Sequence, residues 1–128
     1  QCVLDMTVEY LKTRTQFGRP IGDFQVLQHR AADMYVAVEE ARSIAIYAAM
    51  MVMEVDIEKR RHAMSTTKAQ IGLSCREVGQ GGVQLHGGIG ITEEYAIGHY
   101  FKRLSMIERQ FGDFEHHMTI LSMMDTPE

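Results

Sequence analysis

A run of apolar residues at alternating spacings of three and four constrains the fold more than any other feature of this sequence. The run begins at Phe24 and ends at Val55, more than four repeats of a seven-residue period. It predicts one helix of about 30 residues and about 45 Å, with Asp23 as its N-terminal cap. Helices this long pack side by side in bundles. The apolar positions are Phe24, Leu27, Ala31, Met34, Val38, Ala41, Ala45, Ala48, Val52 and Val55.

Four further segments show a helical pattern, and none alternates with the period of a strand. Residues 14–23 are expected to form a loop, because glycine and proline interrupt them. Thr92 is the expected cap of the fourth helix, where Glu93 and Glu94 suit the positive N-terminal end. The sequence therefore predicts an all-α fold, an antiparallel four-helix bundle with an additional short helix. The expected helices span residues 3–13, 24–55, 58–85, 93–105 and 113–124.

Composition and charge exclude several classes of protein. The 128 residues suffice for one domain with its own core, and 45% of them are hydrophobic. A net charge of −4 argues against a sequence-independent nucleic-acid binder. No apolar run reaches the roughly 18 residues of a membrane span. Cys2 and Cys75 form neither a zinc set nor a disulfide framework, so an intracellular, reducing compartment is expected.

Three glycines within four positions, Gly87, Gly88 and Gly90, separate two helical segments. They follow a helix and not a strand, so they do not fit the dinucleotide fingerprint of a βαβ unit. A helix C-cap followed by a turn explains them structurally. A backbone surface that lies close to a cofactor explains them functionally. The residue types alone leave both explanations open.

The loop over residues 14–23 carries a second candidate site. Arg14 and Arg19 flank Phe17. Forked guanidinium groups suit phosphates, and an aromatic ring between them can pack on a flat ring. The alternative is two solvated arginines and a phenylalanine that anchors the loop in the core.

Metal binding is not expected. Asp113 and His116 form one acidic-x-x-His pair, whereas a di-iron bundle needs two such pairs and two further carboxylates. Glu58 and His62 have helical spacing, but the intervening basic residues are typical of a solvated helix start.

Together these segments resemble, in order and over nearly the whole chain, the C-terminal helical domain of the acyl-CoA dehydrogenase family. Two patterns carry the resemblance, R-x-x-F-G-x-P-[IL]-x-x-[FL]-Q and Q-x-x-G-G-x-G-[IY]-x-x-E-[YF]. They are specific because they occur together, about 60 residues apart. They stand in YLKTRTQFGRPIGDFQVLQH (Tyr10–His29) and AMSTTKAQIGLSCREVGQGGVQLHGGIGITEEYAIGHYFKRL (Ala63–Leu104), and FGDFEHHM (Phe111–Met118) follows.

The resemblance implies a flavoenzyme of three domains. Residues 1–128 match the last domain, and the N-terminal helical and middle β domains are absent from this chain. The implied cofactor is FAD, the substrate an acyl-CoA thioester that undergoes α,β-desaturation, and a further partner an electron-transfer acceptor. A homodimer or homotetramer is expected, or a hetero-oligomer, with much of the subunit contact made by this domain. The expected location is the bacterial cytoplasm or, in a eukaryote, the mitochondrial matrix, and the isolated domain is expected to be inactive.

The resemblance also implies positions for residues that contact FAD. Arg14 matches the family arginine near the pyrophosphate, Phe17 matches the aromatic residue beside it, and Gln25 matches the glutamine at the next helix start.

A second set of matching residues lies in the glycine segment. Gln84 and the backbone of His86, Gly87 and Gly88 match a stretch that lies against the adenosine part of FAD, usually from the neighbouring subunit. A side chain there would hold the cofactor away, so glycine has a steric reason.

Asp113 and Glu115 match the stretch at the last helix start that approaches FAD, although their charge opposes a phosphate. Family chemistry also needs a carboxylate beside the Cα proton of the thioester. Many members carry it as Glu before Gly just ahead of the final helix, and counting from Gly87 puts Phe111 at that place. No catalytic residue is therefore named.

Three explanations remain for the missing base. It lies upstream, outside this chain; or the chain is a non-catalytic subunit whose partner supplies the working site; or the register slips and Asp113 serves. A cofactor-free helical interaction module is the alternative from another class, because the apolar run over residues 24–55 fits that function equally well.

Overall fold

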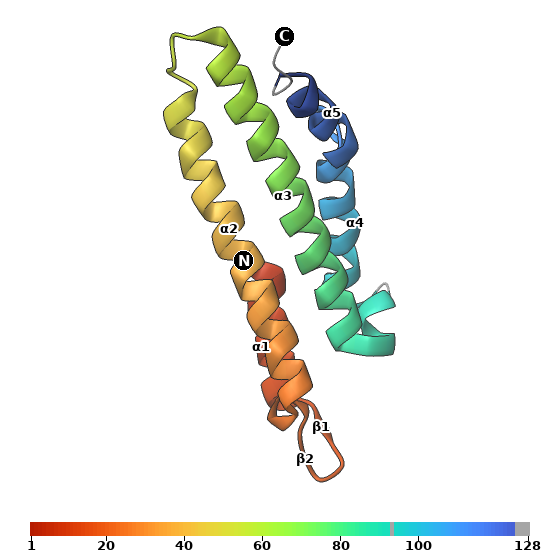
Figure 1. The fold of residues 1–128 in the computed structure, drawn as a ribbon. Helices are drawn as coiled ribbons and strands as arrows, with labels where there is room; N and C mark the ends of the chain where they lie inside the picture. The colour runs from red at the N-terminus through yellow and green to blue at the C-terminus, as the bar shows by residue number, and fades with distance from the viewer. Residues whose placement is uncertain (93, 125–128) are drawn as a thin grey trace.

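The computed structural model describes residues 1–92 and 94–124, and it confirms the predicted all-α bundle (Figure 1). Five α-helices are joined by two short 3-10 turns and a small antiparallel hairpin. In chain order the elements are α1 (Cys2–Thr13), β1 (Thr15–Gln16), β2 (Arg19–Pro20), η1 (Ile21–Asp23), α2 (Gln25–Met51), α3 (Ile57–His86), η2 (Gly87–Ile91), α4 (Ala96–Arg109) and α5 (Phe114–Met124).

Helix α3 is the axis of the bundle. Figure 1 shows α2 rising on one side of α3, which itself runs downward, while α4 and α5 rise on the other side and α1 lies along the lower half. This arrangement follows from small buried residues on α3, which let several neighbours approach its backbone. These residues are Ala63, Ser65, Thr67, Ala69, Gly72, Ser74, Gly79 and Gly82.

The core lies where α1, α2, α3 and α4 meet, toward the hairpin end of the bundle (Figure 1). Met34 and Ile97 are among its most deeply buried side chains, at 2% and 1% exposure. Because four helices converge only in this half, the elements at the hairpin end rest on the best-packed part of the molecule. The core residues are Val3, Leu4, Leu11, Met34, Ala37, Val38, Val78, Leu85 and Ile97.

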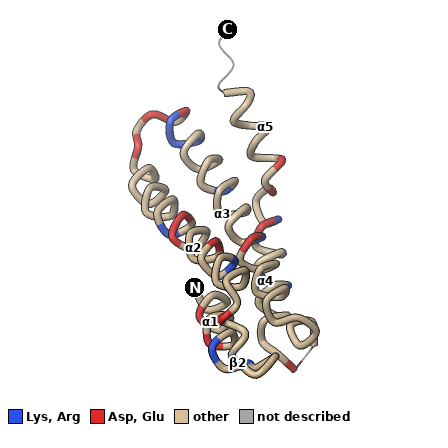
Figure 2. The backbone as a smooth tube through the Cα atoms, turned by 60° about the horizontal axis from the view of Figure 1, so that its bottom comes forward, with Lys and Arg blue, Asp and Glu red and all other residues tan. Residues whose placement is uncertain are grey.

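The second half of α2 is poorly covered. No charged residue occurs from position 43 to position 53, and Figure 2 shows this stretch of α2 in tan. Ile46 is 60% exposed, Met50 71% and Met53 82%. The apolar surface therefore continues beyond the contacts that this chain makes with itself. None of the helices in the described ranges is both long and apolar enough to cross a bilayer.

Two expectations for α2 were wrong. Asp23 does not cap the helix, because it lies inside η1, and Phe24 takes the cap position without a side-chain hydrogen bond. The helix also ends at Met51, so that Val52 and Val55 are 56% and 90% exposed. The nearby cap of α3 explains this end, since the Asp56 carboxylate accepts hydrogen bonds from the first turn of α3 and so fixes where that helix begins.

The expected loop over residues 14–23 contains the β1–β2 hairpin and η1, which the helical pattern gave no means to predict. The expected helix over residues 93–105 begins later, at Ala96, and continues to Arg109. Thr92 does not cap α4, because its hydroxyl donates to the Ile89 carbonyl at 2.8 Å and closes η2 instead. Glu93, one of the two acidic residues expected at the N-terminal end of this helix, lies outside the described residues.

Gly82 and Gly72 give a matched test of the close packing on α3. A Cβ on Gly82 would lie 2.6 Å from Cγ1 of the buried Val3, whereas one on Gly72 would lie 3.4 Å from Cγ of the flexible Glu108 side chain. We expect Gly82→Ala to lower the free energy of unfolding by about 1–3 kcal/mol through overpacking. Gly72→Ala should leave it unchanged or raise it by up to about 1 kcal/mol through helix propensity. Chemical denaturation of both variants measures the difference, and equal stabilities would contradict the packing argument.

Candidate functional site

The predicted residues of the arginine loop and the glycine segment lie at the same end of the bundle. Figure 1 shows the hairpin and η2 together at the bottom of the molecule. Helix α1 links them, because the ring of Tyr10 stacks on His86 with centroids 4.4 Å apart. The Tyr10 hydroxyl also lies 3.5 Å from the His86 carbonyl oxygen. Arg14 follows Tyr10 by one helical turn, so α1 connects the loop to the bend after α3.

Phe17 occupies a position that its residue type disfavours. Gln16 pairs with Arg19, so Phe17 and Gly18 form a two-residue hairpin turn, and both have positive φ, 54° and 79°. This is the pattern of a type I′ turn, in which Asn-Gly is favoured and a bulky residue is an outlier. The Phe17 ring is nevertheless 90% exposed. A strained backbone that holds an aromatic ring in solvent indicates a functional contact.

The two arginines of the loop have different surroundings. Arg19 lies with its guanidinium carbon 4.2 Å from the centre of the Phe24 ring, so its charge is engaged within the loop. The backbone of Arg14 is fixed on both sides, because its N–H donates to Tyr10 and its carbonyl accepts from Ile21, each at 2.8 Å. Arg14 is exposed, and no acidic side chain pairs with it within the described part of the chain. An exposed guanidinium on a fixed backbone is suited to an external anion.

The three glycines after α3 have three different reasons to be glycine. Gly87 has φ of 62°, which favours glycine at the end of a helix. A Cβ on Gly90 would lie 2.8 Å from the Val83 carbonyl oxygen, so packing excludes it. Gly88 has no positive φ, and a Cβ built on it meets nothing within 4 Å. The chain itself therefore gives no reason for glycine at position 88, and the bare backbone there faces open space.

Three further predicted residues lie at this end, and they differ in how exposed their side chains are. Gln84, in the last turn of α3, and Gln25, the first residue of α2, are exposed. The His86 side chain points inward and is 3% exposed, so only its backbone belongs to the surface. The elements that carry the predicted residues, namely the end of α1, the hairpin, the start of α2, the last turn of α3 and η2, lie toward the same end of the bundle (Figure 1). The predicted residues on them are Arg14, Phe17, Gln25, Gln84, Gly87 and Gly88.

Asp113 and Glu115 do not belong to this group. Their turn, between α4 and α5, is tied to Lys68, whose amine donates to the Gly112 carbonyl at 3.0 Å. Lys68 precedes His86 by 18 positions on α3, which corresponds to about 27 Å at the helical rise. The α4–α5 turn and the glycine bend therefore contact different parts of any ligand, or different ligands.

Asp113 has a structural role that argues against its use as a base. Its Oδ1 accepts a hydrogen bond from the backbone N–H of His116 at 2.9 Å, at the start of α5. This hydrogen bond is the main reason why the pKa of the Asp113 carboxyl lies below its usual value. A carboxylate that is stabilised in its charged form is a weaker proton acceptor. Glu115 is exposed in the first turn of the same helix.

Lys68 is the functional-site neighbour that sequence reasoning missed. Its amine donates to the carbonyls of Glu108 at 2.7 Å, Gly112 at 3.0 Å and Ile107 at 3.4 Å. These bonds satisfy the end of α4 and fix a turn in which Phe111 has φ of 61° and is 92% exposed. The partners are about 40 positions away in the sequence, so no local pattern could have revealed them.

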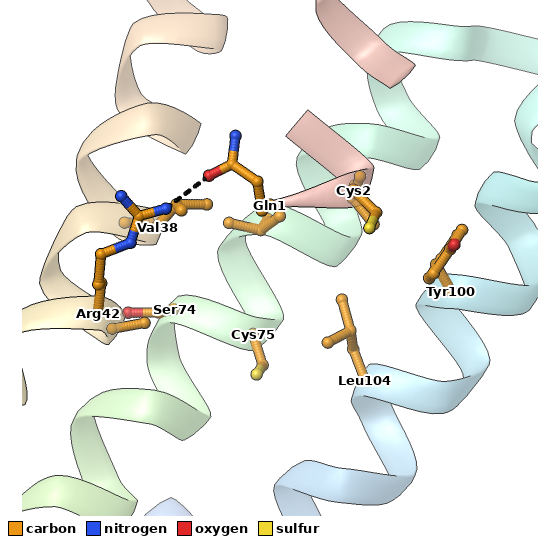
Figure 3. A pocket seen from close by; sticks show the side chains of 12 residues that line it. Gln1, Cys2, Val38, Arg42, Ser74, Cys75, Tyr100 and Leu104 are labelled. Carbon is orange, nitrogen blue, oxygen red and sulfur yellow. Dashed lines mark hydrogen bonds between the residues drawn. The ribbon is translucent and has the colours of Figure 1, made fainter. Parts of the chain in front are cut away.

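An apolar hollow of about 430 Å³ lies elsewhere, among α1, α2, α3 and α4. Figure 3 shows Cys2, Cys75, Tyr100 and Leu104 around it, with Arg42 donating to the Gln1 side chain at 3.0 Å. None of the predicted site residues lines it. Burial raises the pKa of the Cys75 thiol, which makes it a poor nucleophile near neutral pH. Within the described ranges no three potential ligands gather as a metal site.

Known proteins share both sequence and fold with this chain. The family described as "Acyl-CoA dehydrogenase, C-terminal domain" matches residues 1–124. Acyl-CoA dehydrogenase IpdE2 of Mycobacterium tuberculosis is 43% identical over 104 residues, which cover 78% of this chain and 29% of that protein. The chain thus spans less than a third of that curated relative.

Two solved structures have the same fold. The ChsE4-ChsE5 complex from Mycobacterium tuberculosis gives a TM-score of 0.88 at 30% identity, covering 98% of this chain and 34% of the matched chain. Glutaryl-coenzyme A dehydrogenase in its glutaryl-CoA complex gives 0.88 at 28% identity, covering 96% and 31%.

Lys68 can be tested by removing its amine. Lys68→Met leaves the carbonyls at the end of α4 without their donor, so we expect the free energy of unfolding to fall by about 1–3 kcal/mol. Hydrogen exchange of residues 110–117 should become faster. Lys59→Met is the matched control, because Lys59 is 69% exposed and 3.7 Å from Asp56, and such pairs contribute about 0–1 kcal/mol. Equal effects of the two variants would contradict the role assigned to Lys68.

Proposed function

This chain belongs to the acyl-CoA dehydrogenase family, and we propose that it is the FAD-contacting and subunit-contacting domain of a flavin-dependent acyl-CoA dehydrogenase. In this proposal residues 1–128 form the last of three domains, and the full-length protein desaturates an acyl-CoA thioester at its α,β bond. Bound FAD would supply the hydride acceptor for that reaction, and an external acceptor would then take the electrons. The observation that carries the proposal is the bare backbone of Gly88, which the chain's own packing does not explain.

The residues at the hairpin end fit a dinucleotide. Arg14 offers an exposed guanidinium for the pyrophosphate, and the exposed ring of Phe17 offers a flat apolar surface. Gln84 and Gln25 add uncharged hydrogen-bonding groups on the same surface. Gly87 and Gly88 allow the adenosine part to approach the main chain. A charged group, a flat ring, amides and a bare bend together match the chemistry of FAD.

Subunit contact is supported by the uncovered apolar surface of α2. Ile46 and Met50 expose most of their side chains, as do Met53 and Val55 in the following loop. Contiguous apolar surface of this kind marks interaction sites in soluble proteins. We propose a homodimer or homotetramer, in which the hairpin end of one subunit meets FAD bound mainly by its neighbour. A hetero-oligomer is the second arrangement, since one structural relative is a complex of two named chains.

We place the catalytic base outside residues 1–128. Phe111, at the position where many members carry glutamate, has no group that accepts a proton. Asp113 serves as the cap of α5, and its lowered pKa weakens it as a base. The base then comes from an upstream segment of the full-length protein or from a partner subunit. This chain contributes binding and orientation, and the missing segments contribute proton removal.

The FAD contact predicts a specific loss of flavin. Arg14→Met removes a charge-assisted contact, and Gln84→Ala removes an amide, so we expect FAD affinity of the full-length protein to fall roughly tenfold to a hundredfold for Arg14→Met and less for Gln84→Ala. Arg61→Met is the charge-matched control at the opposite end of α3, where Arg61 pairs with Glu58 at 3.2 Å. Flavin absorbance of the purified proteins and FAD titration provide the measurement. Unchanged FAD affinity in both site variants would favour the cofactor-free interaction module.

Phe17 allows binding and stability to be separated. Phe17→Asn places the residue favoured in a type I′ turn at this position, so the melting temperature of the apoprotein should stay the same or rise. The same substitution removes the exposed ring, so FAD affinity should fall. Thermal unfolding and FAD titration of one preparation give both quantities. If FAD affinity does not change, the Phe17 ring is not a cofactor contact.

A further inference from the structure

We propose that the His86 side chain is a positioning residue: an uncharged imidazole, held between Tyr10 and Tyr95, that supports the Gly87–Gly88 bend from beneath and sets an acid limit to cofactor retention. The inference rests on the proposed function of this bend as a flavin contact. It adds a role for the His86 side chain, whereas the family resemblance concerns only the backbone at that position.

The packing of His86 joins three segments beneath the bend. The imidazole is the last side chain of α3 and is 3% exposed. Its centroid lies 4.4 Å from that of Tyr10 in α1, with the planes 28° apart, and 5.1 Å from that of Tyr95, which precedes α4. Any displacement of this ring therefore moves the start of the glycine bend relative to both α1 and α4.

The hydrogen bonds of the ring define its protonation state. Nδ1 lies 2.8 Å from the Gly82 carbonyl oxygen. Because a carbonyl can only accept, Nδ1 carries the hydrogen, and Nε2 of the neutral ring has only a lone pair. Nε2 is buried and has no hydrogen-bond partner in the described part of the chain. Protonation would therefore create a buried N–H group, and a positive charge, without an acceptor.

Within the described residues, the groups that contact the ring offer no carboxylate. Tyr10 from α1 and Tyr95 from the segment before α4 contribute aromatic rings. The α3 neighbour is the Gly82 backbone, and η2 consists only of glycine and isoleucine. Burial lowers the pKa of His86, and the hydrogen bond to Gly82 opposes this effect in part. The geometry and the charges agree that the ring is neutral in the folded protein.

The pKa of His86 is lower in the folded chain than in the unfolded chain, and this difference determines how stability changes with pH. The unfolded chain binds a proton at His86 near the ordinary pKa of about 6.5, whereas the folded chain binds it only at lower pH. The contribution of His86 to stability is therefore complete above about pH 6.5 and declines as pH falls below it. Protonation at the end of that range opens the stack with Tyr10 and releases the bend. FAD should then dissociate more readily in the same pH range.

The experiment compares variants of the full-length protein with bound FAD across pH 5–8. His86→Phe keeps a stacked ring that cannot be protonated, so the acid decline in FAD affinity and in melting temperature, each taken relative to its own value at pH 8, should become smaller. His86→Ala removes the stack, so FAD affinity should fall about tenfold or more at every pH. His86→Gln, which retains an uncharged donor for Gly82, is the second variant if His86→Phe reduces the folded yield. Arg61→Met, near the opposite end of α3, is the control and should keep the unsubstituted pH profile, because Arg61 is exposed there and pairs with Glu58 at 3.2 Å.

Two results would overturn the inference: an acid decline in His86→Phe identical to that of the unsubstituted protein, or full FAD affinity in His86→Ala. A protein that binds no FAD even at neutral pH would instead remove the proposed function. In that case the melting temperatures of His86→Phe and the unsubstituted protein across the same pH range still decide whether the ring supports the bend.

Discussion

The close approach of neighbouring helices to α3 is the constraint on which the rest of the structure depends. Small residues along α3 let α1, α2 and α4 contact its backbone, and Gly82 leaves no room for a methyl group beside Val3. The same helix then holds both candidate contact regions in place, through His86 at its end and Lys68 near its middle. Rigid support of this kind is what a ligand-contacting turn requires, because turns by themselves are mobile.

The three glycines after α3 have different structural causes, which the sequence alone could not distinguish. The residue types alone left two explanations for the segment after α3, a helix cap and a surface close to a cofactor. The coordinates assign the cap to Gly87 by its φ and a packing requirement to Gly90 by its distance from Val83. Only Gly88 remains without an internal cause. Gly88 is therefore the glycine that indicates a ligand contact, because neither its φ nor the packing of the chain requires glycine there.

The fold class and the family could be predicted from the sequence, and both are confirmed. A long apolar pattern predicts a helix reliably because it reflects a whole helix face. The predicted bounds of α3 were accordingly correct to within one residue at each end. Helix ends were less predictable, since Asp23 and Thr92 have the right chemistry for caps but were drawn into 3-10 turns. Lys68 and the role of the His86 side chain could not be found, because both depend on partners brought near by the fold. The assignment of individual residues to FAD stays a prediction.

Phe17 and Phe111 suggest how the domain is divided in function. Each precedes a glycine, each has a positive φ near 60°, and each ring is at least 90% exposed. A bulky residue in the left-handed region is costly, and two such pairs in one chain require a common cause. One pair lies in the hairpin and the other in the turn that Lys68 fixes, a large fraction of the bundle length away. The strain is explained if the hairpin and the α4–α5 turn meet different parts of the proposed full-length protein, so that a single bundle contacts more than one neighbouring domain or cofactor.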